Sequence, residues 1–249
     1  MKELILFLKR FRIFLLNDKQ WNIKNKKFIC QLEEFKKTLP MGVLVTRYPC
    51  LEDATKLTPF EPHYNYHPAW AARVLAKIQP KKHIDISSVT HFSNIVSAFI
   101  PVEFYDYRPA KIILSNYLSG EADLTKLHFA TNSINSLSCM HTLEHIGLGR
   151  YGDPIDMDGD IKAFKELQRV LAVSGNLLVV VPVGKSRVEF NAHRIYSYNY
   201  IIEQFSQLVL QEFALVPDAY EEVGYLINPP VELIDSQNWG CGCFWFTKK

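Results

Sequence analysis

The chain has 249 residues, enough for one domain of moderate size with extensions, and its 48% hydrophobic and 13% aromatic residues can form a substantial core. This composition excludes global disorder, and a net charge of +2 gives no electrostatic reason to expect a nucleic-acid partner. Five cysteines, an odd number without the spacing of a disulfide framework, favour a reducing compartment, so we expect a cytoplasmic protein.

Residues 1–16 are apolar but are interrupted by Lys9, Arg10 and Arg12. The segment is shorter than the ~20 apolar residues that span a bilayer, and it lacks the small-residue cleavage site of a secretory signal. Two interpretations remain. We favour a short helix packed on the domain, and the alternative is a basic amphipathic segment in peripheral contact with the inner face of the membrane.

The chain divides by composition into three parts. Residues 1–42 are Lys-rich with a helical pattern and are predicted to form an N-terminal extension. Residues 43–80 combine an irregular, aromatic lead-in loop with a helix that Pro68 opens at a first-turn position and Pro80 closes. Residues 81–249 are predicted to form the main domain.

The main domain alternates between short apolar runs and helical patterns, which predicts an α/β fold with a mostly parallel, doubly wound sheet. The continuous apolar run LLVVV is typical of a central strand that is buried on both faces. Strands are expected at 83–87, 102–107, 133–140 and 174–183 and at the segments EFALVP and CFWFTK, and helices at 92–100, 160–171 and the segment IIEQFSQL.

The order of these segments resembles class I S-adenosylmethionine-dependent methyltransferases. HIDIS corresponds to the family's first strand, VEFYDYRP to its second, and SINSLSCMHTLEHI to its fourth strand and the residues after it. RVLAVSGN corresponds to the turn before the fifth strand, with Ser174 in place of a glycine. More narrowly, HIDISS, YDYRP, HIGLGRYGDPID and FNAHRIYS resemble an uncharacterised methyltransferase-like group, a domain of unknown function, whose bacterial members are found with surface-polysaccharide genes.

This resemblance implies a seven-stranded Rossmann-like sheet and S-adenosylmethionine as the cofactor. A carboxylate at the end of the second strand can accept hydrogen bonds from both ribose hydroxyls, a role that falls to Asp106, about 20 residues after the first strand. Asp123 then corresponds to the residue beside the adenine amino group. The cofactor-binding candidates are Asp85, Ser87, Ser88, Asp106, Tyr107, Arg108, Asp123, Leu124 and His141.

The first loop departs from the general family. That loop is normally glycine-rich, so that backbone can approach the methionine part of the cofactor. Aligning Asp85 places Ser87, Val89 and His91 at the glycine positions. Side chains there could narrow the pocket, displace the cofactor or abolish its binding, although the narrower group has a similar loop.

Residues 140–160 concentrate histidines and acidic residues in a glycine-punctuated loop after an apolar strand, where an open α/β sheet binds ligands. The HTLEH segment also matches the inverted zinc-protease signature, which needs both histidines on one face of a sustained helix. Gly147 and Gly149 end any helix within about a turn, so we predict no metal site. The CxC pair at 241–243 lacks the second pair that would complete a zinc site.

In this loop, Asp153 and Pro154 are predicted to form a turn and Asp160 to cap the following helix. An EF-hand is excluded because the closing glutamate is missing. Arg150 and Asp156 have no structural explanation, and we predict that they bind a polar, sugar-like substrate. The substrate-binding candidates are Glu144, Arg150, Asp156 and Arg194.

Methyl transfer is a direct displacement on the sulfonium carbon, so the protein supplies alignment and, for a hydroxyl acceptor, a base. His145 and His193 are the candidate catalytic residues. Tyr64, Tyr66 and His67 are predicted to pack in the core rather than to cover the pocket.

We therefore expect methyl transfer to a hydroxyl or other polar group of a small molecule or glycan precursor. One alternative is a catalytically inactive methyltransferase-like scaffold in polysaccharide assembly, and a second is a metal-dependent hydrolase that uses His141, His145 and the nearby aspartates. Cofactor affinity separates the first two possibilities, and metal content tests the third. No prediction follows for the oligomeric state.

Overall fold

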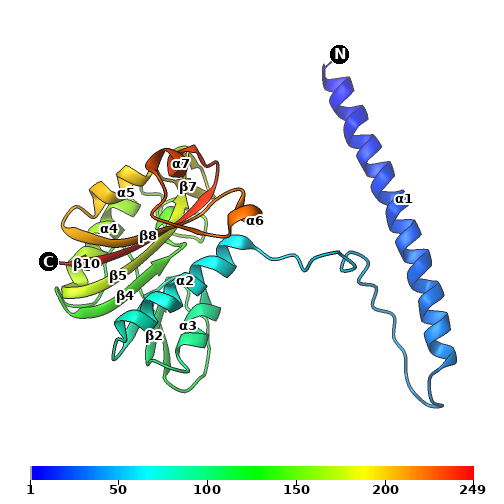
Figure 1. Cartoon of the computed structure of the whole chain (residues 1–249), viewed down its shortest axis with the longest axis horizontal. Coiled ribbons are helices and arrows are strands. Elements are labelled where there is room, and N and C mark those ends of the chain that lie inside the picture. The colour runs from blue at the N-terminus through cyan, green and yellow to red at the C-terminus, as the bar shows by residue number, and fades with distance from the viewer. Residues whose placement is uncertain (1) are drawn as a thin grey trace. The chain divides into compact units, whose positions relative to one another are not determined.

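A computed structural model describes the backbone of residues 2–249 and the side chains of residues 19–249. The chain forms two compact units, residues 1–60 and 61–249, so the boundary between them lies within the predicted lead-in segment. The first unit contains helix α1 (Lys2–Lys37), and Lys24 forms an ion pair with Glu52 (Figure 1).

The predicted membrane contact of residues 1–16 falls on side chains outside the described set, so it stays a prediction. Within the described part of the chain, no helix has both the length and the apolar character needed to cross a membrane.

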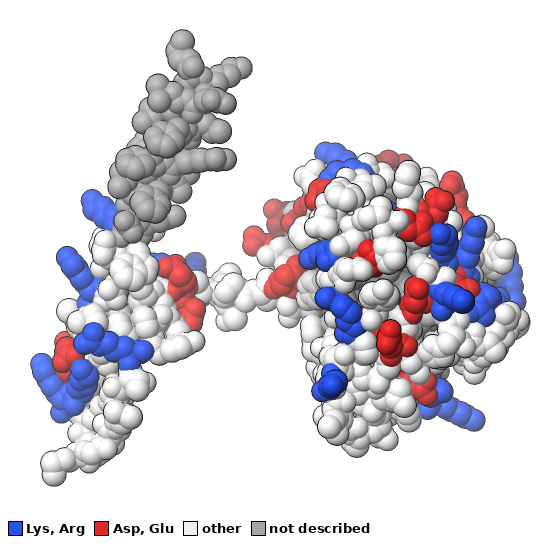
Figure 2. All heavy atoms as spheres, turned by 180° about the vertical axis from the view of Figure 1, so that it is seen from behind, with Lys and Arg blue, Asp and Glu red and all other residues white. Residues whose placement is uncertain are grey.

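Charged side chains of both signs are interspersed on the face of the second unit shown in Figure 2. Within the described residues, that face carries no extended patch of one sign. A mixed surface of this kind does not attract a polyanion strongly.

The second unit is built on one mixed sheet of eight strands, counted within residues 61–249, in the order β3-β2-β1-β4-β5-β10-β8-β9 (Figure 1). The first five strands are parallel, and β10 runs antiparallel to both of its neighbours. The strands are β1 (His83–Ile86), β2 (Val102–Asp106), β3 (Tyr117–Glu121), β4 (Ile134–Met140), β5 (Leu171–Val183), β8 (Leu208–Val216), β9 (Leu226–Ile227) and β10 (Gly240–Lys248).

This topology confirms the predicted fold class, with the two-residue strand β9 added to the seven expected strands. The strand order reverses between β1 and β4, because β2 and β3 lie on one side and β5 on the other. Doubly wound sheets bind ligands at such a switch point, outside the carboxyl ends of the strands. A separate ribbon consists of β6 (Arg187–Glu189) and β7 (His193–Ile195).

Helices cover both faces of the sheet (Figure 1). One face carries α2 (Pro62–Ile78) and α3 (Thr90–Val96), and the latter is shorter than the helix predicted at 92–100. The opposite face carries α4 (Gly159–Val170), α5 (Tyr198–Gln204) and α7 (Val231–Ser236). Short elements complete the unit: the 3₁₀ turn η1 (Leu143–His145) and helix α6 (Tyr220–Val223).

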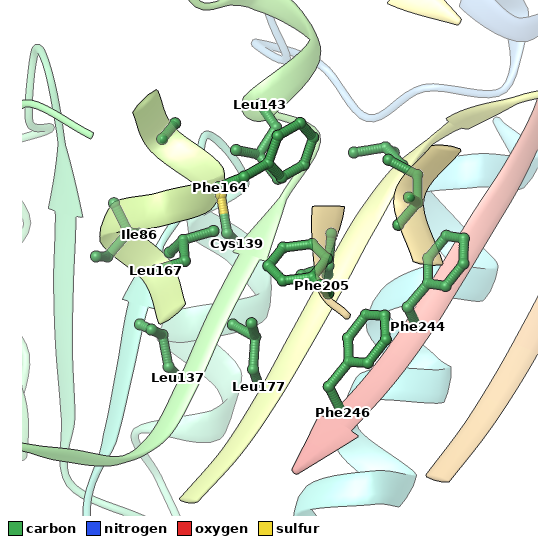
Figure 3. Close-up of a cluster of buried hydrophobic side chains, with 14 of the residues drawn as sticks. Ile86, Leu137, Cys139, Leu143, Phe164, Leu167, Leu177, Phe205, Phe244 and Phe246 are labelled. Atoms are coloured by element: carbon green, nitrogen blue, oxygen red, sulfur yellow. The ribbon is translucent and has the colours of Figure 1, made fainter. Parts of the chain in front are cut away.

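The core consists of two apolar layers, one on each side of the sheet. Phe244 and Phe246 of β10 pack with Phe164 and Phe205 beneath α4 and α5 (Figure 3). Because side chains alternate along a strand, the intervening residues of β10 face the other layer. The cysteines of the CxC segment at 241–243 therefore lie in the layer that contains α2.

Helix α2 begins earlier than predicted. Pro68 was expected in the first turn, but the helix starts at Pro62, and Pro68 lies within it. Pro62 occupies a favourable first-turn position and the Glu61 carboxylate caps the helix, which together offset the hydrogen bond that Pro68 cannot donate. His63 and His67 are consequently one turn apart on the buried side of α2.

The prediction that Asp160 caps α4 is wrong. The helix begins at Gly159, and Asp158 at the N-cap position makes no capping bond through its side chain. Asp160 is buried in the first turn, where it accepts a hydrogen bond from the Tyr196 hydroxyl at 3.0 Å and lies 3.4 Å from Arg194 Nε. Asp160 Oδ1 also accepts a hydrogen bond from the Ile161 backbone N–H at 3.1 Å, so the carboxylate bonds the first turn from within the helix and not from the N-cap position.

Candidate functional site

A pocket of about 370 Å³ lies at the carboxyl ends of β1, β2, β3 and β4, at the point where the strand order reverses. This volume is within the usual range for small-molecule sites. The residues that follow each of these four strands form its wall, together with the loop after η1.

The pocket brings together most of the predicted site residues. Those that line it are Ser88, Asp106, Tyr107, Arg108, Asp123, Leu124, His141, His145 and Asp156. The remaining candidates do not line it and are Asp85, Ser87, Glu144, Arg150, His193 and Arg194.

Two carboxylates are held in place by the turns that follow β2 and β3. Asp106 Oδ1 accepts a hydrogen bond from the Arg108 backbone N–H at 2.7 Å. Asp123 Oδ1 accepts from the backbone N–H and the hydroxyl of Thr125, at 2.8 and 2.7 Å. Among the described residues, Oδ2 of each carboxylate has no hydrogen-bond donor, so each is available to a ligand in the pocket.

The glycine-poor first loop does not fill the pocket. Ser87 and Val89 are buried, and neither lines the pocket. The Ser87 hydroxyl donates to Asp85 at 2.5 Å and accepts from the Met140 backbone N–H at 2.9 Å, and Val89 packs in the apolar layer of α2. His91 is exposed and lies outside the lining as well. The side chains of Ser87, Val89 and His91, which stand where the general family has glycines, thus leave the pocket open.

Asp85 lies beneath this loop rather than in the pocket. It is fully buried, and the hydroxyls of Ser87 and Ser138 donate to its Oδ1 at 2.5 Å. Burial raises the pKa of Asp85 to about 7, although both hydrogen bonds act in the opposite direction. Since the carboxyl connects β1, the first loop and β4, it positions the loop instead of contacting a ligand.

His141 ends β4 with an unusual backbone conformation and a buried partner. Its φ is +50°, in the left-handed region, where non-glycine residues are uncommon. The Nδ1 atom lies 2.8 Å from Glu144 Oε1, and Nε2 lies 3.6 Å from Cys241 Sγ. Burial alone would raise the pKa of Glu144, but the hydrogen bond with His141 lowers it below its ordinary value, so the carboxyl is ionised.

The two candidate bases differ in position. His145 lines the pocket, and its Nδ1 lies 2.6 Å from the Ala192 carbonyl oxygen. Nδ1 must therefore carry the proton, which leaves Nε2 as an acceptor. His193 lies outside the lining, stacks on Trp239 and has its Nε2 3.2 Å from Glu189 Oε2, and burial lowers its pKa.

The predicted substrate-binding residues mostly hold the loop together. Asp156 lines the pocket, but its carboxylate is paired with Lys162 at 2.5 Å. Arg150 is exposed and donates to the Ala192 carbonyl at 3.3 Å. Arg194 is buried and donates at 2.7 Å to a backbone carbonyl of the loop. Of these three, only Asp156 is in a position to contact a ligand in the pocket.

Tyr151 also lines the pocket, although no sequence pattern predicted it as a site residue. The Arg108 guanidinium lies 4.7 Å from its ring centre, so the two side chains connect the turn after β2 to the loop after η1. Asp153 organises that loop by accepting hydrogen bonds from the backbone N–H groups of Gly147, Gly149 and Tyr151. The turn predicted at Asp153 and Pro154 lies instead just before them, at Arg150 and Tyr151.

His63 is a second residue near the site that was not predicted from sequence. Its ring stacks on that of His141, with the centres 5.7 Å apart, and Tyr64 and His67 lie at 5.3 and 5.0 Å from the same ring. The i, i+4 spacing of the two histidines was a usable signal, but it was hidden because this segment was predicted to be an irregular loop.

Comparison with known proteins supports this architecture. The model of a family described as Caenorhabditis protein of unknown function, DUF268, matches residues 115–207. No curated protein matches the chain significantly.

Two solved structures with TM-scores of 0.53 are similar to this chain. A geranyl diphosphate methyltransferase in complex with S-adenosylmethionine is 12% identical, over 75% of this chain and 87% of that one. The N-methyltransferase NodS from Bradyrhizobium japonicum WM9, in complex with S-adenosylhomocysteine, is 13% identical, over 80% of this chain and 91% of that one. Residues 61–249 thus have the fold of class I S-adenosylmethionine-dependent methyltransferases.

Proposed function

We propose that this protein binds S-adenosylmethionine in the pocket and transfers its methyl group to a hydroxyl or other polar group of a small molecule or glycan precursor. The observation that carries the proposal is that Asp106 and Asp123 offer their carboxylates to one pocket from the ends of neighbouring strands. The glycan part depends on the resemblance of YDYRP and HIGLGRYGDPID to the group found with polysaccharide genes.

The residues present fit the cofactor. Asp106 would accept hydrogen bonds from the ribose hydroxyls, and Asp123 from the adenine amino group, each through the oxygen that the protein leaves without a donor. Leu124 adds an apolar surface beside them. Bound there, the cofactor supplies an electrophilic methyl group attached to a sulfonium.

His145 is the base in this proposal. Its Nδ1–H is held by the Ala192 carbonyl, so Nε2 is free to accept the proton of an acceptor hydroxyl. Glu144 Oε1 lies 3.9 Å from Nε2, the nitrogen that would take the proton. Glu144 is buried and outside the lining, so it acts through His145 as a positioning residue.

The first loop and the HTLEH segment give less support to the alternative functions than to methyl transfer. The scaffold interpretation depended on a first loop that closes the pocket, but Ser87 and Val89 pack away from it. The hydrolase interpretation required a sustained helix through the HTLEH segment, whereas η1 has only three residues. Neither alternative is proposed further.

Calorimetric titration with S-adenosylmethionine and S-adenosylhomocysteine tests the proposal. We expect wild type to bind, and Asp106→Asn and Asp123→Asn to bind about 10- to 100-fold more weakly, because a hydrogen bond to a charged group contributes about 1.5–3 kcal/mol. Glu121→Gln is the matched control, since this exposed carboxylate ends β3 outside the pocket lining. Absence of binding to wild type, or equal affinity in all four proteins, would refute the proposal.

A further inference from the structure

Three metal-ligating side chains from distant parts of the chain meet in the buried layer between α2 and the sheet. His63 comes from the first turn of α2, His141 from the end of β4 and Cys241 from the start of β10. One ligand atom of each lies within 4.8 Å of the other two, and all three residues are buried. Strand β10 is antiparallel, so its first residues lie at the same edge of the sheet as the carboxyl end of β5.

The distances around Cys241 match those around a tetrahedral metal. Its Sγ lies 3.6 Å from His141 Nε2 and 3.9 Å from Cys243 Sγ. Zinc bonds of about 2.0–2.1 Å to nitrogen and about 2.3 Å to sulfur place N and S ligands about 3.6 Å apart and two sulfurs about 3.8 Å apart. Both separations are therefore compatible with one shared zinc ion.

The histidines are oriented as metal ligands usually are. His141 Nδ1 lies 2.8 Å from Glu144 Oε1, which leaves Nε2 facing Cys241 Sγ. A carboxylate on the far nitrogen of a metal-binding histidine is a common outer-shell partner, because it sets the tautomer and raises the basicity of the ligand. His67 Nδ1 is held in the same way by the His63 carbonyl at 2.6 Å.

Two buried polar atoms beside this cluster lack hydrogen-bond partners among the described residues. They are Nε2 of His67, whose ring centre lies 5.0 Å from that of His141, and Oε2 of Glu144. Native proteins rarely leave buried polar atoms unsatisfied, and such atoms often mark a missing ion or water. A cation and its bound water at the cluster would give such atoms a partner.

We propose that His63, His141 and Cys241 bind a zinc ion, with Cys243, whose Sγ lies 3.9 Å from that of Cys241, as the candidate for a fourth position. Thiolate and imidazole together select zinc over magnesium or calcium, which prefer oxygen ligands. The ion joins α2 to two strands of the sheet, and His141 also lines the pocket. The zinc ion would therefore have a structural role behind the pocket wall. This site differs from the hydrolase site considered from sequence, which combined His141 with His145 and the aspartates.

Metal content and cobalt spectra of the full-length protein test this site. The protein is produced in zinc-supplemented medium, kept reduced, and purified with a histidine-free tag and no metal resin. We expect close to one zinc per chain. After the zinc is exchanged for Co²⁺, a thiolate-to-cobalt charge-transfer band should appear in the near ultraviolet, together with the strong visible bands of a tetrahedral site. Zinc removal by a chelator should lower Tm by at least about 5 °C.

Matched variants assign the ligands. Cys241→Ala and His63→Gln should each lose the bound metal, and Cys241→Ala should also lose the charge-transfer band. Cys139→Ala is the control, because Cys139 is equally buried but belongs to the apolar layer on the other side of the sheet. Wild-type protein that binds neither zinc nor cobalt would overturn the proposal, and this result needs no variant to fold. An unchanged charge-transfer band in folded Cys241→Ala would overturn it as well.

Discussion

The buried carboxyl of Asp85 makes the free energy of unfolding depend on pH with a defined sign. Burial raises its pKa in the folded protein to about 7, from an ordinary value of 3.8. Between these two values the folded protein holds a proton that the unfolded chain has lost. The stability associated with the protonated carboxyl is therefore fully present below about pH 4 and is lost as the pH rises toward about 7.

The two pKa values of Asp85 set the magnitude of this effect. A pKa difference of about three between the folded and unfolded states corresponds to about 4 kcal/mol at full ionisation. The part of this loss that falls between about pH 5 and about pH 8 is roughly 3 kcal/mol. This is a large fraction of the 5–15 kcal/mol that roughly spans the stability of natural domains.

Urea denaturation at about pH 5 and at about pH 8 checks the Asp85 prediction. Asp85→Asn keeps an oxygen that can accept from Ser87 and Ser138 but has no titrating proton. From the lower to the higher pH, we expect the free energy of unfolding of wild type to fall by roughly 3 kcal/mol more than that of this variant. Asp53→Asn, at an exposed carboxyl, should follow wild type. Parallel pH profiles for wild type and Asp85→Asn would show that the reasoning about burial is wrong.

Two further predictions concern the loop around the pocket. Gly147→Ala should destabilise the protein by about 2 kcal/mol or more in thermal unfolding, because φ is +76° and a Cβ would lie 2.0 Å from the Asp156 carbonyl oxygen. Gly152→Ala, with φ +85° but open space, should cost less, and the reverse order would contradict the structure. His145→Gln should retain cofactor binding but slow methyl transfer by about 10²- to 10⁴-fold in a screen of sugar and glycan acceptors, with His193→Gln much closer to wild type.

The sequence determined most strands of the sheet and the edge at which the pocket lies, but not strands β3 and β9. Strands β1, β4 and β5 were recognisable because strands buried on both faces are rich in apolar residues, although β1 and β4 also bury His83, Asp85 and Ser138. Asp106 and Asp123 were identified through the resemblance of their segments to class I methyltransferases, and strand β3, which precedes Asp123, was not predicted. Each of these features is carried by a short stretch of sequence. Short segments were therefore enough to predict the strands and the edge of the sheet where the aspartates lie.

Only the tertiary structure decided which side chains share a site. His63, His141 and Cys241 are far apart in the chain and meet because α2 packs on the sheet while β10 inserts between β5 and β8. The sequence of the first loop could not show that the Ser87 side chain bonds Asp85 and stays outside the pocket, which is therefore open. Burial and long-range contact depend on how whole elements pack, and no local periodicity contains that information.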